Sequence, residues 1–150
     1  MVMYCVKSGI EFEFELPNKP TTTSQQKGVS FKGGKPHFYE KKKVKTQRSL
    51  YAMAVRSAFN RAGVPFPYYD GLVSVNISFY FGVKNKRLWG HLKPTKPDAD
   101  NSVKLMLDVL SDLHFWRDDA QVVVLRILKF YDEKSKIKIR LEEIEDEGVN

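Results

Sequence analysis

The sequence predicts an α+β fold, in which a mixed β-sheet of about four to five strands packs against two principal helices. Two kinds of hydrophobic spacing support this prediction. Apolar and polar residues alternate in Glu11–Leu16, Leu72–Val83 and Lys136–Glu142, as they do in strands with one buried face. Apolar residues recur every three or four positions in Val44–Ala62 and Val103–Leu113, as they do in amphipathic helices.

The first strand is predicted over Glu11–Leu16, where acids alternate with apolar residues until Pro17. The segment Asn18–Ser24 is predicted to be a loop, as is the glycine-rich stretch through Lys32–Pro36. The first helix is expected from about Val44 to Ala62, because glycine favours a helix end at the next position and a proline follows shortly.

The second strand, Leu72–Val83, has the clearest alternation, and the second helix follows a long basic loop. Gln121–Tyr131 is almost continuously apolar, which is typical of a strand covered on both faces, by a helix or by another subunit. A turn and the last strand, Lys136–Glu142, come next. The acidic tail Glu145–Asn150 is expected to fray.

Composition and charge limit the class of protein and the kind of partner that the sequence is compatible with. The 150 residues are enough for one domain with a core, and 42% hydrophobic residues are typical of a folded protein. A net charge of +7 favours a polyanionic partner such as nucleic acid, although it is also compatible with a role in solubility alone. A single cysteine excludes an internal disulfide and a thiolate zinc site. No segment resembles a signal peptide or a membrane span, so we expect a cytoplasmic protein without a membrane partner.

Basic residues gather in two segments, which are the candidates for contact with DNA phosphates. The segment Lys27–Arg48 has aromatic residues interleaved with its lysines, and Lys84–Pro97 contains basic residues and no acid. A solvated loop and helix start is the alternative interpretation of the first segment. Trp89 in the second segment either stacks on a base or fills a gap in the core. The predicted DNA-binding residues are Lys41, Lys42, Lys43, Lys84, Lys86, Arg87, Lys93 and Lys96.

Aspartates flank the second predicted helix. Asp98 and Asp100 precede or begin it, and Asp118 and Asp119 precede the next strand. Helix capping accounts well for one aspartate and poorly for several. We expect the helix and the returning strand to bring the two acidic ends together. Two carboxylates about 4 Å apart repel by roughly 4 kcal/mol at an effective dielectric of 20, so convergence requires a proton or a cation between them. Oxygen ligands favour Mg²⁺.

These features suggest metal-assisted hydrolysis of a phosphodiester, in which a divalent cation activates water and polarises the phosphate. Lys104 lies four residues after Asp100, on the same helix face. Its ammonium group is suited to the charge that develops on the phosphate. The alternative is an ion pair with Asp100 or Asp108, which contributes only a few tenths of a kcal/mol.

One combination of motifs resembles the RusA family of Holliday-junction resolvases. The residues that carry the resemblance are Lys96-Pro97-Asp98-Ala99-Asp100-Asn101, Lys104, Asp108, Trp116, Asp118-Asp119, Gln121-Val122 and Lys129. The resemblance implies that Asp98, Asp100 and Asp119 bind Mg²⁺, for which Mn²⁺ can substitute, and that Lys104 is the catalytic lysine. Ala99 departs from the bulkier aliphatic residue of the family, and the first ninety residues are longer than in compact members.

The resemblance also implies a single RusA-like endonuclease domain over residues 1–150. Such enzymes are homodimers that cut two opposed strands of a four-way DNA junction symmetrically, a task that suits two-fold symmetry. Two alternatives remain at this point. One is a metal-dependent nuclease that acts on flaps or plain duplex, and the other is a DNA-binding module without catalytic activity, in which the aspartates only cap helices and balance lysines.

Overall fold

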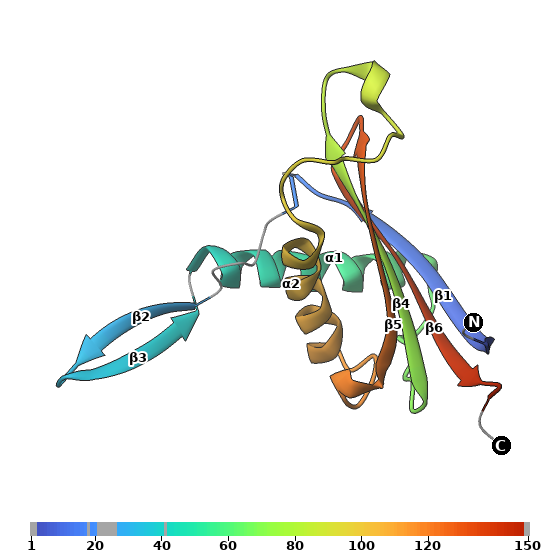
Figure 1. The fold of residues 1–150 in the computed structure, drawn as a ribbon, viewed down its shortest axis with the longest axis horizontal. Helices are drawn as coiled ribbons and strands as arrows, with labels where there is room; N and C mark the ends of the chain where they lie inside the picture. The colour runs from blue at the N-terminus through green and yellow to red at the C-terminus, as the bar shows by residue number, and fades with distance from the viewer. Residues whose placement is uncertain (1–2, 18, 21–26, 41, 149–150) are drawn as a thin grey trace.

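The computed structural model describes residues 3–17, 19–20, 27–40 and 42–148 (Figure 1). The main sheet contains β1 (Tyr4–Glu15), β4 (Leu72–Gly82), β5 (Val122–Asp132) and β6 (Lys136–Asp146), in the order β1-β6-β4-β5. β4 pairs parallel with β5, whereas β6 pairs antiparallel with both β1 and β4. The sheet is therefore mixed and four-stranded, as the hydrophobic spacing predicts.

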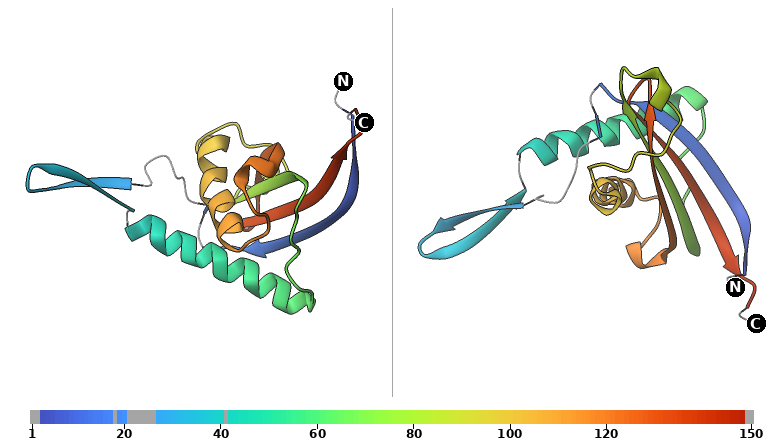
Figure 2. Two further views of the ribbon diagram at one scale, coloured as in Figure 1. Left: turned by 90° about the horizontal axis from the view of Figure 1, so that it is seen from below. Right: turned by 45° about the horizontal axis from the view of Figure 1, so that its top comes forward.

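The two long helices, α1 (Lys42–Ala62) and α2 (Ala99–Asp112), pack on one face of this sheet (Figures 1 and 2). The prediction of an α+β fold with two principal helices is confirmed. The described helices include none that is long and apolar enough to cross a membrane.

The core lies between the helices and the inward face of the sheet. The alternation predicted for β4 is confirmed, because every second side chain of that strand from Val73 to Phe81 is at most 2% exposed. The opposite face of the sheet carries charged residues at its surface. There Lys138 donates a 2.8 Å hydrogen bond to Glu11, and this bond lowers the pKa of the Glu11 carboxyl. The polar outer face thus supports the pairing of β1 with β6 without belonging to the core.

A hairpin replaces part of the predicted loop. β2 (Lys27–Lys32) and β3 (Lys35–Glu40) pair antiparallel in a sheet of their own, joined by Gly33 and Gly34 (Figure 1). Both glycines have positive φ, as a two-residue hairpin turn requires. The prediction of a loop was wrong here because hydrophobic alternation reports burial, and the described side chains of this hairpin, at residues 29–36, are exposed. The predicted loop residues 18 and 21–24 lie outside the described residues.

The outer strands are longer than predicted. β1 begins at Tyr4 rather than Glu11, and β6 continues to Asp146 where a frayed tail was expected. Tyr4 pairs with Asp146, so the ladder continues where both strands leave the core. Most side chains of these ends are exposed or half-buried, although Ile144 is buried, so backbone pairing continues the ladder where the side-chain pattern is weak.

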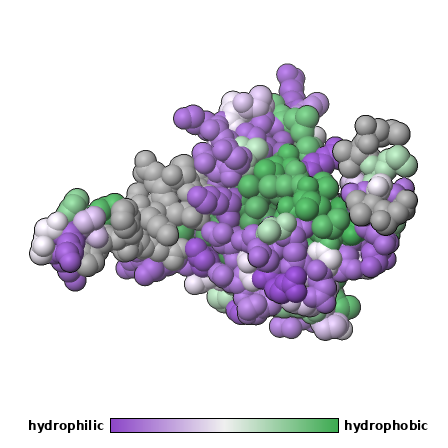
Figure 3. All heavy atoms as spheres, turned by 60° about the horizontal axis from the view of Figure 1, so that its bottom comes forward, coloured by the Kyte–Doolittle hydropathy of each residue, from purple (hydrophilic) through white to green (hydrophobic). Residues whose placement is uncertain are grey.

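β5 is an edge strand of the main sheet, and its cover is incomplete. α2 packs beside it, yet Val123 is 53% and Leu125 is 43% exposed. Among the described residues, neighbours occupy its edge at the far end, where Leu92 forms a bridge with Phe130. Figure 3 shows that the body of the molecule carries an apolar surface framed by hydrophilic side chains. The cover is thus incomplete in the single chain, and cover of both faces by another subunit stays a prediction.

Candidate active site

The first two predicted ligands lie at the start of α2. Asp98 occupies the N-cap position, but its side chain makes no capping hydrogen bond. Asp100 lies in the first turn and is exposed, and Lys104 is exposed one turn further along. Helix capping therefore does not explain the Asp98 side chain. The arrangement leaves two carboxylates and an ammonium group at one helix end.

Lys129 of β5 fixes the segment that leads into α2. Its ammonium group donates to the backbone carbonyls of Thr95 and Pro97, at 2.8 and 2.6 Å. The start of α2 consequently lies beside the far end of β5. Hydrogen bonds to a charged donor are stronger than neutral ones, so this contact holds Asp98 in place relative to the sheet.

The second acidic pair lies around the short helix η2 (Asp119–Gln121). Asp118 accepts a hydrogen bond from the Ala120 N–H at 2.9 Å, and the Gln121 side chain accepts from the Asp118 N–H at 2.8 Å. These reciprocal bonds form a capping box, which satisfies N–H groups at the helix start. Asp118 thus has a structural task, and it is not among the predicted metal ligands.

Asp119 is held by a different contact. The Trp116 indole N–H donates to one oxygen of the Asp119 carboxylate at 2.8 Å, and Trp116 itself is 1% exposed. Gln121 joins this turn to the segment before β4 by donating to the carbonyls of Tyr69 and Gly71, each at 2.9 Å. The supporting roles of Trp116 and Gln121 were not predicted, although both belong to the motif that carries the family resemblance.

The two acidic ends do not meet within one chain. α2 has 14 residues, which corresponds to a length of roughly 21 Å. Asp98 lies before its start, and η2 lies beyond its other end (Figure 1). In the part of the chain that the structure describes, no group of three His, Cys, Asp or Glu side chains is placed to hold a metal ion. The expected convergence through the helix and the returning strand is therefore absent from the single chain.

The predicted DNA-binding residues fall into two regions. Lys42 and Lys43 are exposed at the start of α1, where the helix dipole also favours phosphate, and Lys41 lies outside the described residues. Lys93 makes cation–π contacts within the chain, since its ammonium group lies 5.3 and 5.2 Å from the ring centroids of Phe81 and Tyr131. The exposed members of the β4–α2 loop are Lys84, Lys86, Arg87 and Lys96.

A hollow of about 860 Å³ lies at the base of this loop and adds two basic residues that were not predicted. Lys19 follows β1, and Lys134 belongs to the β5–β6 turn, so distant segments bring them beside Lys84 and Lys86. Trp89 also lines the hollow, and its indole N–H donates to the Val83 carbonyl at 2.8 Å. This bond and its partial burial favour a role for Trp89 in shaping the loop.

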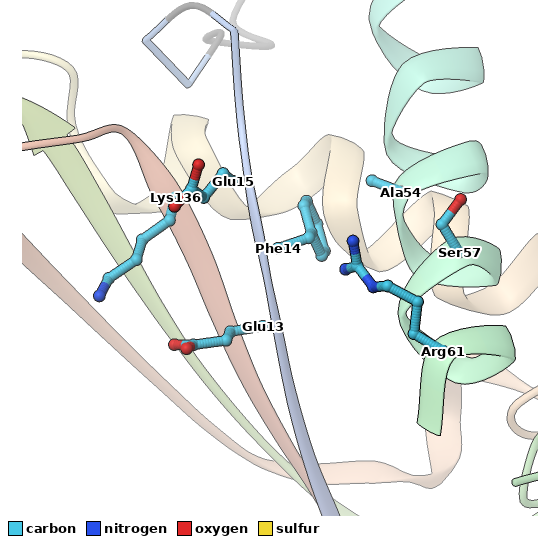
Figure 4. Close-up of a pocket in the computed structure, with 7 residues that line it drawn as sticks. All are labelled: Glu13, Phe14, Glu15, Ala54, Ser57, Arg61 and Lys136. Carbon is cyan, nitrogen blue, oxygen red and sulfur yellow. The ribbon is translucent and has the colours of Figure 1, made fainter. Parts of the chain in front are cut away.

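A second hollow, of about 410 Å³, lies between β1 and α1 (Figure 4). Glu13 and Glu15 come from the strand, whereas Arg61 comes from the helix. Its charges are of both signs, and none of the predicted catalytic residues lines it. It therefore offers no better site for phosphodiester chemistry than the aspartates around α2.

Comparison with known proteins decides the family. The family model of endodeoxyribonuclease RusA matches residues 17–142. The chain belongs to the RusA family. It is accordingly an endodeoxyribonuclease, an enzyme that hydrolyses phosphodiester bonds within DNA.

Two relatives cover nearly the whole chain. A protein of Lactococcus phage r1t named crossover junction endodeoxyribonuclease rusA is 34% identical over 134 residues, which are 89% of this chain and 98% of the phage protein. The uncharacterized protein YqaN of Bacillus subtilis strain 168 is 31% identical over 153 residues, which are 95% of this chain and 99% of that protein.

Proposed function

We propose that this RusA-family enzyme is a Mg²⁺-dependent homodimer that resolves Holliday junctions by paired, symmetric cuts in two opposed strands. The observation that carries the proposal is the similarity over nearly the full length to a phage protein named for crossover junctions. Two features of this chain support it. The net charge of +7 suits a substrate with several DNA arms, and the Asp98 carboxylate at the start of α2 makes no capping hydrogen bond.

We propose further that the catalytic centre is completed between two copies. Asp98 and Asp100 lie at the end of α2 where Lys129 contacts Pro97, and Asp119 lies beyond the other end. If one ion takes all three carboxylates, Asp119 must then come from the partner subunit. The donor set fits Mg²⁺, which prefers carboxylate oxygens and keeps several waters.

The edge strand β5 offers a way to form this dimer. A two-fold axis near Leu125 sets two β5 edges antiparallel, and exposed strand edges readily pair between chains. The beginning of β5 from the partner subunit then lies beside the Lys129 end of this β5, and Asp119 directly precedes that beginning. The same contact covers Val123 and Leu125, which the single chain leaves exposed.

Each residue of the proposed centre then has its own role. Asp98 and Asp100 would hold the ion together with Asp119 of the partner subunit, whose carboxylate is oriented by the Trp116 N–H bond. A bound divalent ion supplies an activated water and draws charge from the phosphate. Lys104 faces the phosphate and stabilises the negative charge that builds up there. The exposed lysines of the β4–α2 loop hold the DNA backbone in place.

The Asp100→Asn substitution tests this function. The side chain keeps its size and Asp100 is exposed, so we expect folding and junction binding to be retained. Cleavage should fall by about a thousandfold or more, because a principal ligand is lost. The measurement follows a labelled four-way junction and a linear duplex of the same sequence, with Mg²⁺ and with chelator.

Asp112→Asn serves as the matched control, because Asp112 lies at the other end of the same helix. Its bond to Arg48 is exposed, so its loss should affect stability by less than about 1 kcal/mol and leave cleavage intact. Unchanged cutting by the Asp100→Asn variant would refute the site. Equal cleavage of duplex and junction would instead favour a nuclease of broader substrate range.

A further inference from the structure

The hairpin β2–β3 extends away from the body of the molecule (Figures 1 and 2). Its strands are paired with each other in a separate two-stranded sheet. A lone two-stranded hairpin is only marginally stable in water unless it packs against something. Six residues of strand reach about 20 Å, which is enough to contact part of a substrate that the body does not touch.

The tip of the hairpin is open on all sides and carries an aromatic residue. A Cβ atom added to Gly33 or Gly34 would meet no atom within 4 Å. Phe31 lies directly before the turn segment and is 74% exposed, the largest exposed fraction among the large apolar side chains described. It stands opposite Pro36 in the strand register, so one face of the tip is apolar.

The other face of the tip is positively charged. Lys32 and Lys35 stand directly opposite each other beside the turn, and both are exposed. Like charges directly opposite across a strand pair are destabilising, and a polyanion between them removes the repulsion. The described side chains of the tip, residues 29–36, include no acid to balance them. This charge favours DNA over a second copy of this basic chain as the partner.

An aromatic ring and two lysines together fit one feature of nucleic acid. Lysines bind the phosphate backbone anywhere along it, whereas a ring needs the face of a base that is not already stacked. Bases within a duplex are stacked on both sides. In a four-way junction, stacking is interrupted where the strands exchange.

We propose that the hairpin tip binds the branch point of the junction, with Phe31 stacked on a base there and Lys32 and Lys35 on the adjacent phosphates. This inference rests on the proposed function, since it requires a branched DNA substrate. It assigns junction selectivity to a projection of the chain remote from the catalytic aspartates.

The test compares wild-type protein with Phe31→Ala in the presence of chelator, which prevents cutting. A four-way junction carrying 2-aminopurine at the branch point reports stacking, and a linear duplex of the same sequence reports general binding. Phe31→Ala should bind the junction about tenfold or more weakly, keep duplex affinity within about twofold, and lose the branch-point fluorescence change. Phe31→Trp should restore both the affinity and the fluorescence change.

Ser30→Ala is the matched control, because Ser30 is exposed on the opposite face of the same strand. It should behave as wild type. The Lys32→Gln, Lys35→Gln double variant should weaken binding to both DNAs and reduce the salt dependence of binding. The inference is overturned if Phe31→Ala binds both DNAs as wild type does, if it loses affinity for both DNAs equally, or if it changes the oligomeric state.

Failure of this inference is distinguishable from failure of the proposed function. Wild-type cleavage of the junction with Mg²⁺ tests the function on its own. If wild type cuts junctions and Phe31→Ala binds them normally, only the role of the hairpin is refuted. If wild type does not cut junctions, the function itself is refuted.

Discussion

At the scale of single residues, the four aspartates around α2 have different environments. Asp118 caps η2, and Asp119 accepts a hydrogen bond from a buried tryptophan. Asp98 holds a capping position without using its side chain for a cap. The contrast separates one structural aspartate from three candidates for metal binding, although all four have similar sequence surroundings.

Trp116→Phe tests whether Asp119 depends on its tryptophan. The substitution removes the 2.8 Å N–H donor, so the carboxylate loses its fixed orientation. Partners of this kind typically contribute about 10- to 100-fold to metal affinity or activity. Cleavage should fall by that factor at low Mg²⁺ and recover partly at high Mg²⁺, as measured by titration of the cleavage rate.

Phe115→Leu provides the comparison for packing alone, because Phe115 is also fully buried and precedes Trp116 in the chain. Each variant should lose about 1–2 kcal/mol of unfolding free energy. Only Trp116→Phe should change the Mg²⁺ requirement. If both variants shift that requirement equally, Trp116 acts through the core and does not position Asp119.

At the scale of secondary-structure elements, β5 links the fold to the proposed dimer. Its far end contacts the segment before α2 through Lys129, and its near end follows η2. Between them, Val123 and Leu125 are exposed on an edge strand. The strand that would join the two halves of the proposed catalytic centre is also a strand whose apolar side chains lack cover in the single chain.

Leu125→Glu is expected to dissociate the dimer. A charge placed in an apolar contact must be desolvated, so the dissociation constant should rise more than about tenfold. Sedimentation should show monomer in place of dimer, and cleavage should fall in parallel. Met53→Glu is the control, since Met53 is 63% exposed on α1, and it should remain dimeric and active. A Leu125→Glu protein that stays dimeric would place the interface elsewhere.

At the scale of the whole molecule, the proposed completion of the centre between copies would give each dimer two equivalent sites. Each site would take Asp100 from one chain and Asp119 from the other. Two sites related by a two-fold axis match two equivalent phosphates on opposed strands. Paired cutting would thus follow from the symmetry of the dimer.

Mixed dimers test this arrangement. A dimer of one Asp100→Asn chain and one Asp119→Asn chain has one site with both substitutions and one intact site, if the sites are shared. Each homodimer should be inactive, whereas the mixed dimer should nick one strand per junction. Two affinity tags isolate the mixed dimer, and a supercoiled cruciform plasmid distinguishes nicked from linear product. An inactive mixed dimer would show that each site lies within one chain.

Residue types along the chain are enough to identify the elements that have a buried face and the motif. Alternation in β4 and helical spacing in α1 and α2 report burial, so these elements are readable from residue types. The aspartates, Lys104 and the Trp116–Gln121 turn were recognisable because their chemistry and spacing are uncommon together. The hairpin was not recognisable, since its described side chains, at residues 29–36, are exposed.

The positions of the two acidic ends follow from the packed fold and cannot be derived from spacing along the chain. Spacing along the chain allowed Asp100 and Asp119 to meet, but a straight helix of 14 residues separates them. The structure also showed that Asp118 caps η2 and that Lys129 fixes the start of α2. It further showed that Phe31 is 74% exposed beside the turn of a projecting hairpin. Distances across a fold depend on how rigid elements are oriented, and that orientation arises from packing rather than from local sequence.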